Sequence, residues 1–164
     1  MFLTDGPAAG RRSGWMGLGL MLGVLSSAPA YAQAPPAQAQ PVAAVRLYPN
    51  DGAMVLNFIK PDKVADFEEV MAKLKEALMK SDKPERKEQA KGWKIFKSPD
   101  PAGANVLYVF VIDPSVKTAD YQISNIIAEA FPVAEANVIR QKYADAFAQG
   151  INIINLSLFQ KLGE

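Results

Sequence analysis

The alternation and clustering of apolar residues divide the chain into strands and helices from about residue 45 onward. Dense branched and aromatic residues predict strands at 53–60, 92–98, 106–112 and 151–160. Apolar residues spaced by three and four predict helices at 61–82, 118–131 and 135–150, with Asp62 as the expected N-cap of the first. The run 81–91, SDKPERKEQAK, is polar and predicts a connector.

This order of elements, β-α-β-β-α-(α)-β, is that of the split β-α-β or ferredoxin-like arrangement. Short connections and the right-handed crossover preference favour it over other topologies. The predicted fold class is therefore α+β, with a four-stranded antiparallel sheet and the helices on one face.

The closing stretch INIINLSLFQ, residues 151 to 160, has apolar residues on both faces, because alternate side chains of a strand point to opposite sides. Ile153 and Phe159 would lie on one face, and Ile154 and Leu156 on the other. A sheet with one helical layer is expected to alternate apolar and polar residues. We therefore expect a second copy to cover the outer face and form a two-fold homodimer, a dimeric barrel. The alternative is that the segment 45–52 or a helix folds over it.

The first 32 residues resemble a cleavable export signal. Arg11 and Arg12 precede the apolar stretch GWMGLGLMLGVLSSAPA, and AYA at 30–32 has the form of a cleavage site. The apolar stretch is shorter than the roughly 20 residues of a spanning helix, so no stable membrane insertion is expected after cleavage. General secretion and twin-arginine export both stay open. The expected organisation is a signal peptide at 1–32, a disordered Pro/Ala/Gln-rich linker at 33–44 and a folded domain at 45–164, in a periplasmic or secreted protein.

Composition narrows the classes of function further. Removal of the predicted signal peptide, 32 of the 164 residues, leaves a mature chain of 132 residues. Because the signal peptide contains Arg11, Arg12 and Asp5, the 18 basic and 17 acidic residues of the full chain become 16 of each. This balance predicts no nucleic-acid partner. The sequence has no His and no Cys, so no Ser-His-Asp or Cys-His arrangement can be built. No metal site and no cofactor are predicted, because thiolate, imidazole and glycine-rich phosphate motifs are all missing from the sequence.

With its two-sided strands, the stretch from about 50 to 162 resembles the dimeric α/β-barrel superfamily, which includes antibiotic-biosynthesis-type monooxygenases. The segments GWKIFKS, VLYVFVIDP, DYQISNIIAEAF and NLSLFQ more closely resemble secreted bacterial proteins of unassigned function. Monooxygenase-type members use a pocket between sheet and helices, some with an Asn on the first strand and a Trp nearby. The resemblance thus implies a ligand pocket at Asn57 and Trp93; the absence of His excludes the haem-degrading type.

Four residues are candidates for ligand binding: Asn57, Trp93, Tyr108 and Asn155. The two amides either orient a ligand or bond to each other, the backbone or water. Trp93 either stacks on a flat ligand or fills the core, and the Tyr108 phenol either enters a pocket or lies at its rim. We expect an exported domain that binds a small hydrophobic molecule or a protein partner. The alternatives are a cofactor-free monooxygenase-like enzyme and a structural envelope protein, so catalysis is left open.

Overall fold

The computed structural model describes residues 43–163, which contain every predicted strand and helix of the folded domain. The predicted signal peptide at 1–32 and residues 33–42 of the predicted linker lie outside the described residues. The last two residues of that linker, Ala43 and Ala44, are described, and Ala43 is hydrogen-bonded to the Asn125 side chain.

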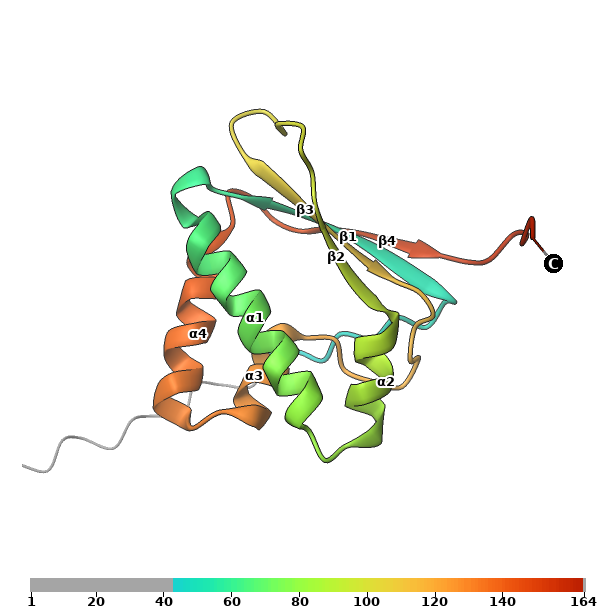
Figure 1. The fold of residues 1–164 in the computed structure, drawn as a ribbon, viewed down its shortest axis with the longest axis horizontal. Helices are drawn as coiled ribbons and strands as arrows, with labels where there is room; N and C mark the ends of the chain where they lie inside the picture. Colours follow the sequence, from blue (N-terminus) through green and yellow to red (C-terminus); the bar gives the residue numbers. More distant parts are fainter. Residues whose placement is uncertain (1–42, 164) are drawn as a thin grey trace, which may run out of the picture. The chain divides into compact units, whose positions relative to one another are not determined.

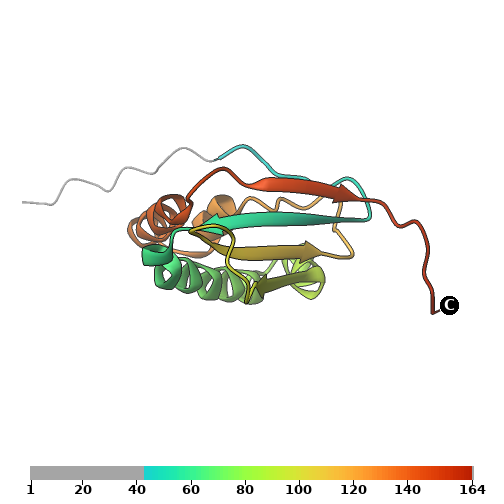
Figure 2. The ribbon, with the colours of Figure 1, turned by 90° about the horizontal axis from the view of Figure 1, so that it is seen from above.

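A four-stranded antiparallel sheet forms one layer of the domain. Its strands are β1 (Gly52–Ile59), β2 (Trp93–Lys97), β3 (Val106–Ile112) and β4 (Asn152–Leu156). The strand order is β2-β3-β1-β4, which Figure 2 shows from above. Both central strands pair antiparallel with their neighbours, and this order confirms the predicted ferredoxin-like α+β fold.

The helices form the second layer, on one side of the sheet (Figure 1). They are α1 (Val64–Lys80), which follows the 3₁₀ turn η1 (Pro61–Lys63), then α2 (Pro84–Gly92), α3 (Ile123–Ala130) and α4 (Val133–Ala146). The apolar stripe of α1 packs against the sheet through Phe67, Val70 and Leu74, which are fully buried. The core therefore lies between the sheet and the helices.

The two faces of the sheet differ in burial, as their alternating residues show. Along β1, Ala53, Val55 and Ile59 face the helices and are buried. The residues between them, Met54, Leu56 and Phe58, are half-buried on the outer face, as are Leu107, Val109 and Val111 of β3. Phe96 of β2 is 54% exposed on that face. Within the described residues, the four α-helices all lie on the opposite side, so the outer face is apolar and uncovered.

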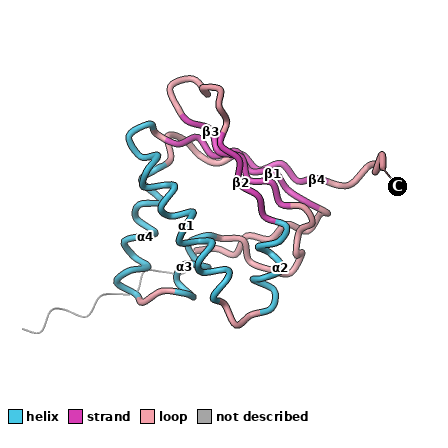
Figure 3. The backbone as a smooth tube through the Cα atoms, viewed as in Figure 1, coloured by secondary structure: helices cyan, strands magenta, loops and turns pink. Residues whose placement is uncertain are grey.

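The segment 45–52 does not cover the outer face, which was the alternative to a second copy. Its Arg46 and Tyr48 instead line a cavity on the helix side, and the Tyr121 N–H donates to the Arg46 carbonyl at 2.8 Å. The chain after β4 continues as a loop that leaves the sheet (Figure 3).

Four local predictions were wrong. The predicted connector 81–91 contains the helix α2. Asp62 lies in the 3₁₀ turn, and the N-cap of α1 is Lys63, without a side-chain capping bond. The helix predicted from 118 begins at Ile123, because residues 118–122 form a hydrogen-bonded loop. The last strand ends at Leu156 rather than at 160.

Candidate functional site

A small cavity lies between the inner face of the sheet, the helices and the segment 43–48. Its volume is about 10 Å³, at the lower limit of what holds one water molecule. The sheet contributes its floor through β1, β2 and β3, and loop 119–122 and α4 contribute its walls. The lining residues are Arg46, Tyr48, Val55, Asn57, Trp93, Phe110, Tyr121, Gln122, Ile123 and Tyr143.

Asn57 lies on the inner face of β1 and is completely buried. Its Nδ2 donates to the carbonyls of Val55 and Tyr108, both at 3.2 Å. These two acceptors fix the orientation of the amide, since a flipped amide would place its oxygen against both carbonyls. Its Oδ1 is buried and has no hydrogen-bond partner among the described residues. A buried acceptor without a partner costs roughly 1–3 kcal/mol.

Trp93 begins β2 and contributes the second unpartnered atom. Its ring contacts Phe110, with centroids 5.8 Å apart, and Tyr121, with centroids 5.4 Å apart. The indole Nε1 is buried and finds no acceptor among the described residues. Asn57 and Trp93, which carry this acceptor and this donor, both line the cavity.

Three phenols surround this pair. Burial raises the pKa of Tyr48, of Tyr121 and of Tyr143 above the ordinary value of 10.0, and the nearby Arg46 charge opposes the rise at Tyr48 and Tyr143. The Tyr48 and Tyr121 rings lie 5.0 Å apart, and the Tyr121 hydroxyl accepts from the Val116 N–H at 2.8 Å. All three phenols are therefore neutral at neutral pH.

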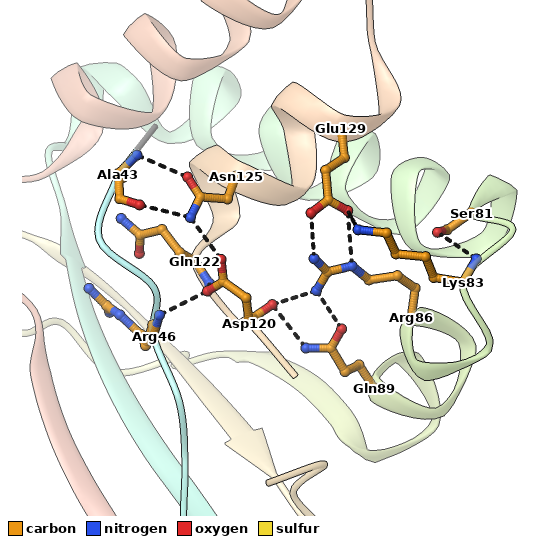
Figure 4. Close-up of polar contacts among 10 residues, drawn as sticks. All are labelled: Ala43, Arg46, Ser81, Lys83, Arg86, Gln89, Asp120, Gln122, Asn125 and Glu129. Carbon is orange, nitrogen blue, oxygen red and sulfur yellow. Dashed lines mark hydrogen bonds and ion pairs between the residues drawn. The ribbon is translucent and has the colours of Figure 1, made fainter. Parts of the chain in front are cut away.

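The segment 43–48 forms the roof of the cavity and is held by side chains of loop 119–122 and α3 (Figure 4). The Asn125 amide accepts from the Ala43 N–H at 3.0 Å and donates to the Ala43 carbonyl at 2.9 Å. Asp120 accepts from the Arg46 N–H at 2.8 Å. These bonds replace the ladder that a sheet would provide for an extended segment.

Asp120 is the centre of these contacts. Its carboxylate also accepts from the Gln122 N–H at 2.8 Å and from Asn125 Nδ2 at 2.7 Å. Burial disfavours the charged form, but the hydrogen bonds from Arg46, Asn125 and Gln122 outweigh it and hold the pKa of Asp120 below its ordinary value of 3.8. The Asp120 carbonyl accepts from Arg86 and Gln89, which ties the loop to α2.

The other two predicted candidates lie apart from the cavity. The Tyr108 ring packs on Phe67, with centroids 4.7 Å apart, and its hydroxyl donates to Glu68 Oε1 at 2.5 Å. This is the rim arrangement that the sequence left as an alternative. Asn155 was expected to be embedded among apolar residues, but it is exposed on the edge strand β4. Of the four candidates, the structure brings Asn57 and Trp93 together.

The sequence reasoning missed Arg46, Tyr48 and Tyr121 as cavity residues. Arg46 and Tyr48 precede the first strand, and Tyr121 falls in a stretch predicted as helix. No pattern in the sequence indicated that Tyr48 and Tyr121 lie close together, because they are far apart along the chain.

Within residues 43–163, His, Cys, Asp and Glu form no group of three or more that could hold a metal ion. None of the helices described there is long and apolar enough to cross a membrane.

These features define the class of protein as a ferredoxin-like α+β domain with a small buried cavity between sheet and helices. No family model matches the sequence, and no match was found among the curated proteins. Among solved structures, the chain is similar to a Caulobacter crescentus CB15 protein whose assignment as an antibiotic biosynthesis monooxygenase is itself provisional. The two share 16% identity and a TM-score of 0.39 over 69% of this chain and 94% of the other. The fold class rests on the strand order of the chain itself.

Proposed function

We propose that this chain is an exported, periplasmic domain that binds a small hydrophobic molecule between its sheet and its helices. The observation that carries the proposal is the pair Asn57 Oδ1 and Trp93 Nε1, two buried polar atoms that have no hydrogen-bond partner within residues 43–163 and belong to residues lining one cavity. Buried polar atoms in folded proteins are nearly always satisfied, so these two atoms need a hydrogen-bonding partner, which either a water molecule or the polar group of a ligand supplies.

We also propose that the domain pairs through the outer face of its sheet. The half-buried residues of β1 and β3, together with Phe96 and Ile154, form an apolar surface that the described helices leave uncovered. Contiguous apolar surfaces of this kind mark interaction sites. A second copy would bury this surface and leave the cavity on the other side of the sheet unobstructed.

The competing function is a cofactor-free monooxygenase-like enzyme acting on a small hydrophobic substrate. That reaction needs a cavity that encloses the reacting part of a substrate, and binding cavities of this type usually hold several hundred Å³. The cavity at Asn57 and Trp93 has about 10 Å³ in this conformation. Both functions need the cavity to widen, and binding without chemistry is preferred because the sequence has no His or Cys and so offers few catalytic groups.

Native mass spectrometry of the protein purified from the cells that produce it tests these points together. The expected result is a dimer that lacks residues 1–32 and carries one small molecule per copy. A monomer with the full mass of 164 residues and no added mass would contradict the export, the pairing and the binding. Incubation with oxygen and the retained molecule, followed by mass analysis of that molecule, separates binding from catalysis: an added oxygen atom would favour the enzyme.

A further inference from the structure

The segment after β4, residues 157–163, carries large apolar side chains that its own domain leaves exposed. We call this segment the arm. Leu158 is 61% exposed, Phe159 is 97% exposed and Leu162 is 91% exposed. Phe159 and Leu162 are the two most exposed large apolar residues in the described part of the chain. Because exposure of apolar surface to water is unfavourable, these side chains need a surface on which to pack.

Two hydrogen bonds fix the start of the arm. Asn50 Nδ2 donates to Ser157 Oγ at 3.0 Å. The Leu158 N–H donates to Asp51 Oδ2, also at 3.0 Å. Figures 1 and 2 both show the arm extending beyond the end of the sheet. A chain segment that is tied down at its start leaves the domain in a defined direction, so the side chains that follow are presented to another molecule.

The arm continues the apolar outer face of the sheet. An open surface hollow of about 340 Å³ has Val111 and Leu156 of the sheet among its lining residues, together with Leu158 and Phe159 of the arm. Val111 lies on the outer face, and Leu156 does so too, because it follows the outer-face Ile154 by two positions. The arm and the outer face therefore form one continuous apolar surface.

The size of the outer face indicates that pairing needs more than the sheet. The four strands are five to eight residues long, and with a spacing of about 4.8 Å and a rise of about 3.3 Å per residue they have a footprint of about 400 Å². A stable interface buries about 800 Å² on each partner. One buried aromatic side chain contributes about 150–250 Å², so Phe159 and the two leucines of the arm supply much of the remainder.

We propose that the arm of each copy packs on the sheet of a second copy and completes the surface through which the two copies pair. In a two-fold dimer each copy presents the same surfaces, so both arms cross to the opposite copy. Phe159 becomes the anchor of the arm, since buried aromatic residues contribute most to interfaces of this kind. This inference rests on the pairing proposed above and adds the segment that crosses between the copies.

Photocrosslinking of the purified protein tests where the arm lies. Phe159→p-benzoylphenylalanine places a light-activated group on the arm, and Val138→p-benzoylphenylalanine places it at an exposed apolar position on α4 as the control. In an equal mixture of isotope-labelled and unlabelled copies, irradiation of the arm variant should give covalent dimers that contain peptide pairs of mixed label. The control should give none. Cross-links confined to single chains, or no cross-link in a protein that sediments as a dimer, would overturn the proposal.

Sedimentation equilibrium of a double variant tests what the arm contributes. Phe159→Ser combined with Leu162→Ser should raise the dissociation constant of the dimer about tenfold or more. Both side chains are almost fully exposed in a single copy, so the circular dichroism spectrum of the double variant should match that of the wild type. Val138→Ser, which removes an apolar side chain that is 58% exposed on α4, should leave the dissociation constant unchanged. Equal dissociation constants for the wild type and the double variant would overturn the proposal.

Comparison with Phe96→Lys, which places a charge on the outer face, separates this inference from the pairing on which it rests. A wild-type protein that is monomeric at high concentration would show that both are wrong. A dimer that Phe96→Lys dissociates but that the double variant of the arm leaves intact would keep the pairing through the outer face and overturn the role of the arm. Dissociation by both, together with cross-links from the arm between copies, is the result we expect.

Discussion

Arg86 of α2 and Glu129 of α3 form a two-bond ion pair inside the helical layer. Arg86 Nη2 lies 2.9 Å from Glu129 Oε1, and Nε lies 3.3 Å from Oε2. Arg86 is 2% exposed, yet its guanidinium also donates to Gln89 Oε1 at 2.7 Å and to the Asp120 carbonyl at 2.5 Å. The pair thus holds the loop that carries Asp120, and through Asp120 it reaches the roof of the cavity (Figure 4).

We expect Arg86→Met to lower the free energy of unfolding by about 2–3 kcal/mol, since it removes the buried guanidinium that donates to Glu129, Gln89 and the Asp120 carbonyl. Lys83 and the Gln89 amide remain as donors to Glu129 and the Asp120 carbonyl and offset part of the loss. Urea denaturation followed by circular dichroism measures this. Lys83→Met is the matched control, because Lys83 pairs with the same Glu129 but is 54% exposed. It should cost less than about 1 kcal/mol. Equal losses in the two variants would contradict the structural role of Arg86.

Stability should fall in acid through Glu129 and Asp120. Burial opposes the ionisation of Glu129, but hydrogen bonds from Arg86 and Lys83 outweigh it and hold its pKa below the ordinary 4.5, as the pKa of Asp120 is held below 3.8. A carboxyl group whose pKa is lowered by folding stabilises the protein at any pH above its pKa in the unfolded chain. This stabilisation is lost as the pH falls through the lowered pKa of the folded protein. Urea midpoints measured from about pH 6 to about pH 3 should therefore decrease. The urea midpoint of Arg86→Met should decrease less with falling pH than that of the wild type. An equal decrease in the two proteins would show that the contacts of Arg86 do not cause the acid sensitivity.

The roof of the cavity should loosen in Asn125→Ala. This substitution removes both bonds to Ala43 and one to Asp120, so the segment 43–48 should open more often. Trypsin cleavage after Arg46, followed by mass spectrometry, should become about fivefold faster or more. Asn155→Ala, at an exposed amide on β4, should leave the rate unchanged. An unchanged rate in both variants would show that other contacts hold the segment.

Gly92 should not tolerate a larger residue, because a Cβ there would collide with the Pro114 carbonyl oxygen. The Gly92 carbonyl also accepts from the Asp113 N–H at 2.9 Å, so the two segments cannot separate freely. We expect Gly92→Ala to lower the free energy of unfolding by about 1–3 kcal/mol in thermal or urea unfolding. Gly150→Ala, where a Cβ meets open space, is the control and should change stability far less.

Pairing through the outer face should depend on Phe96. A lysine at this position on the edge strand β2 would place a charge within the proposed interface, so Phe96→Lys should shift the protein from dimer to monomer in sedimentation equilibrium. Val138→Lys, at a similarly exposed apolar residue on α4, should leave the dimer intact. A wild-type protein that is monomeric at high concentration would refute the interface directly.

Local patterns in the sequence predicted the strands and the long helix α1 because these elements carry periodic apolar residues, which β1, β3 and α1 bury. They failed for α2, which has Arg86, Gln89 and Gly92 as its buried residues. A helix with a polar buried face is stable only where the rest of the chain provides hydrogen-bond partners, here Glu129 and the Asp120 carbonyl. The prediction that Asn155 is embedded among apolar residues was wrong because β4 is an edge strand that the helices leave exposed.

The sequence by itself determined the order of the strands and of the helices other than α2, the ferredoxin-like topology and the apolar character of both sheet faces, because these follow from periodicities of two and 3.6 residues. Tertiary structure alone decided that Asn57 and Trp93 share a cavity, that Arg46 and Tyr48 close it, and that Tyr108 and Asn155 lie elsewhere. These contacts join residues from strands, a loop and the segment before β1. Their distances depend on how the layers pack, which no local pattern encodes.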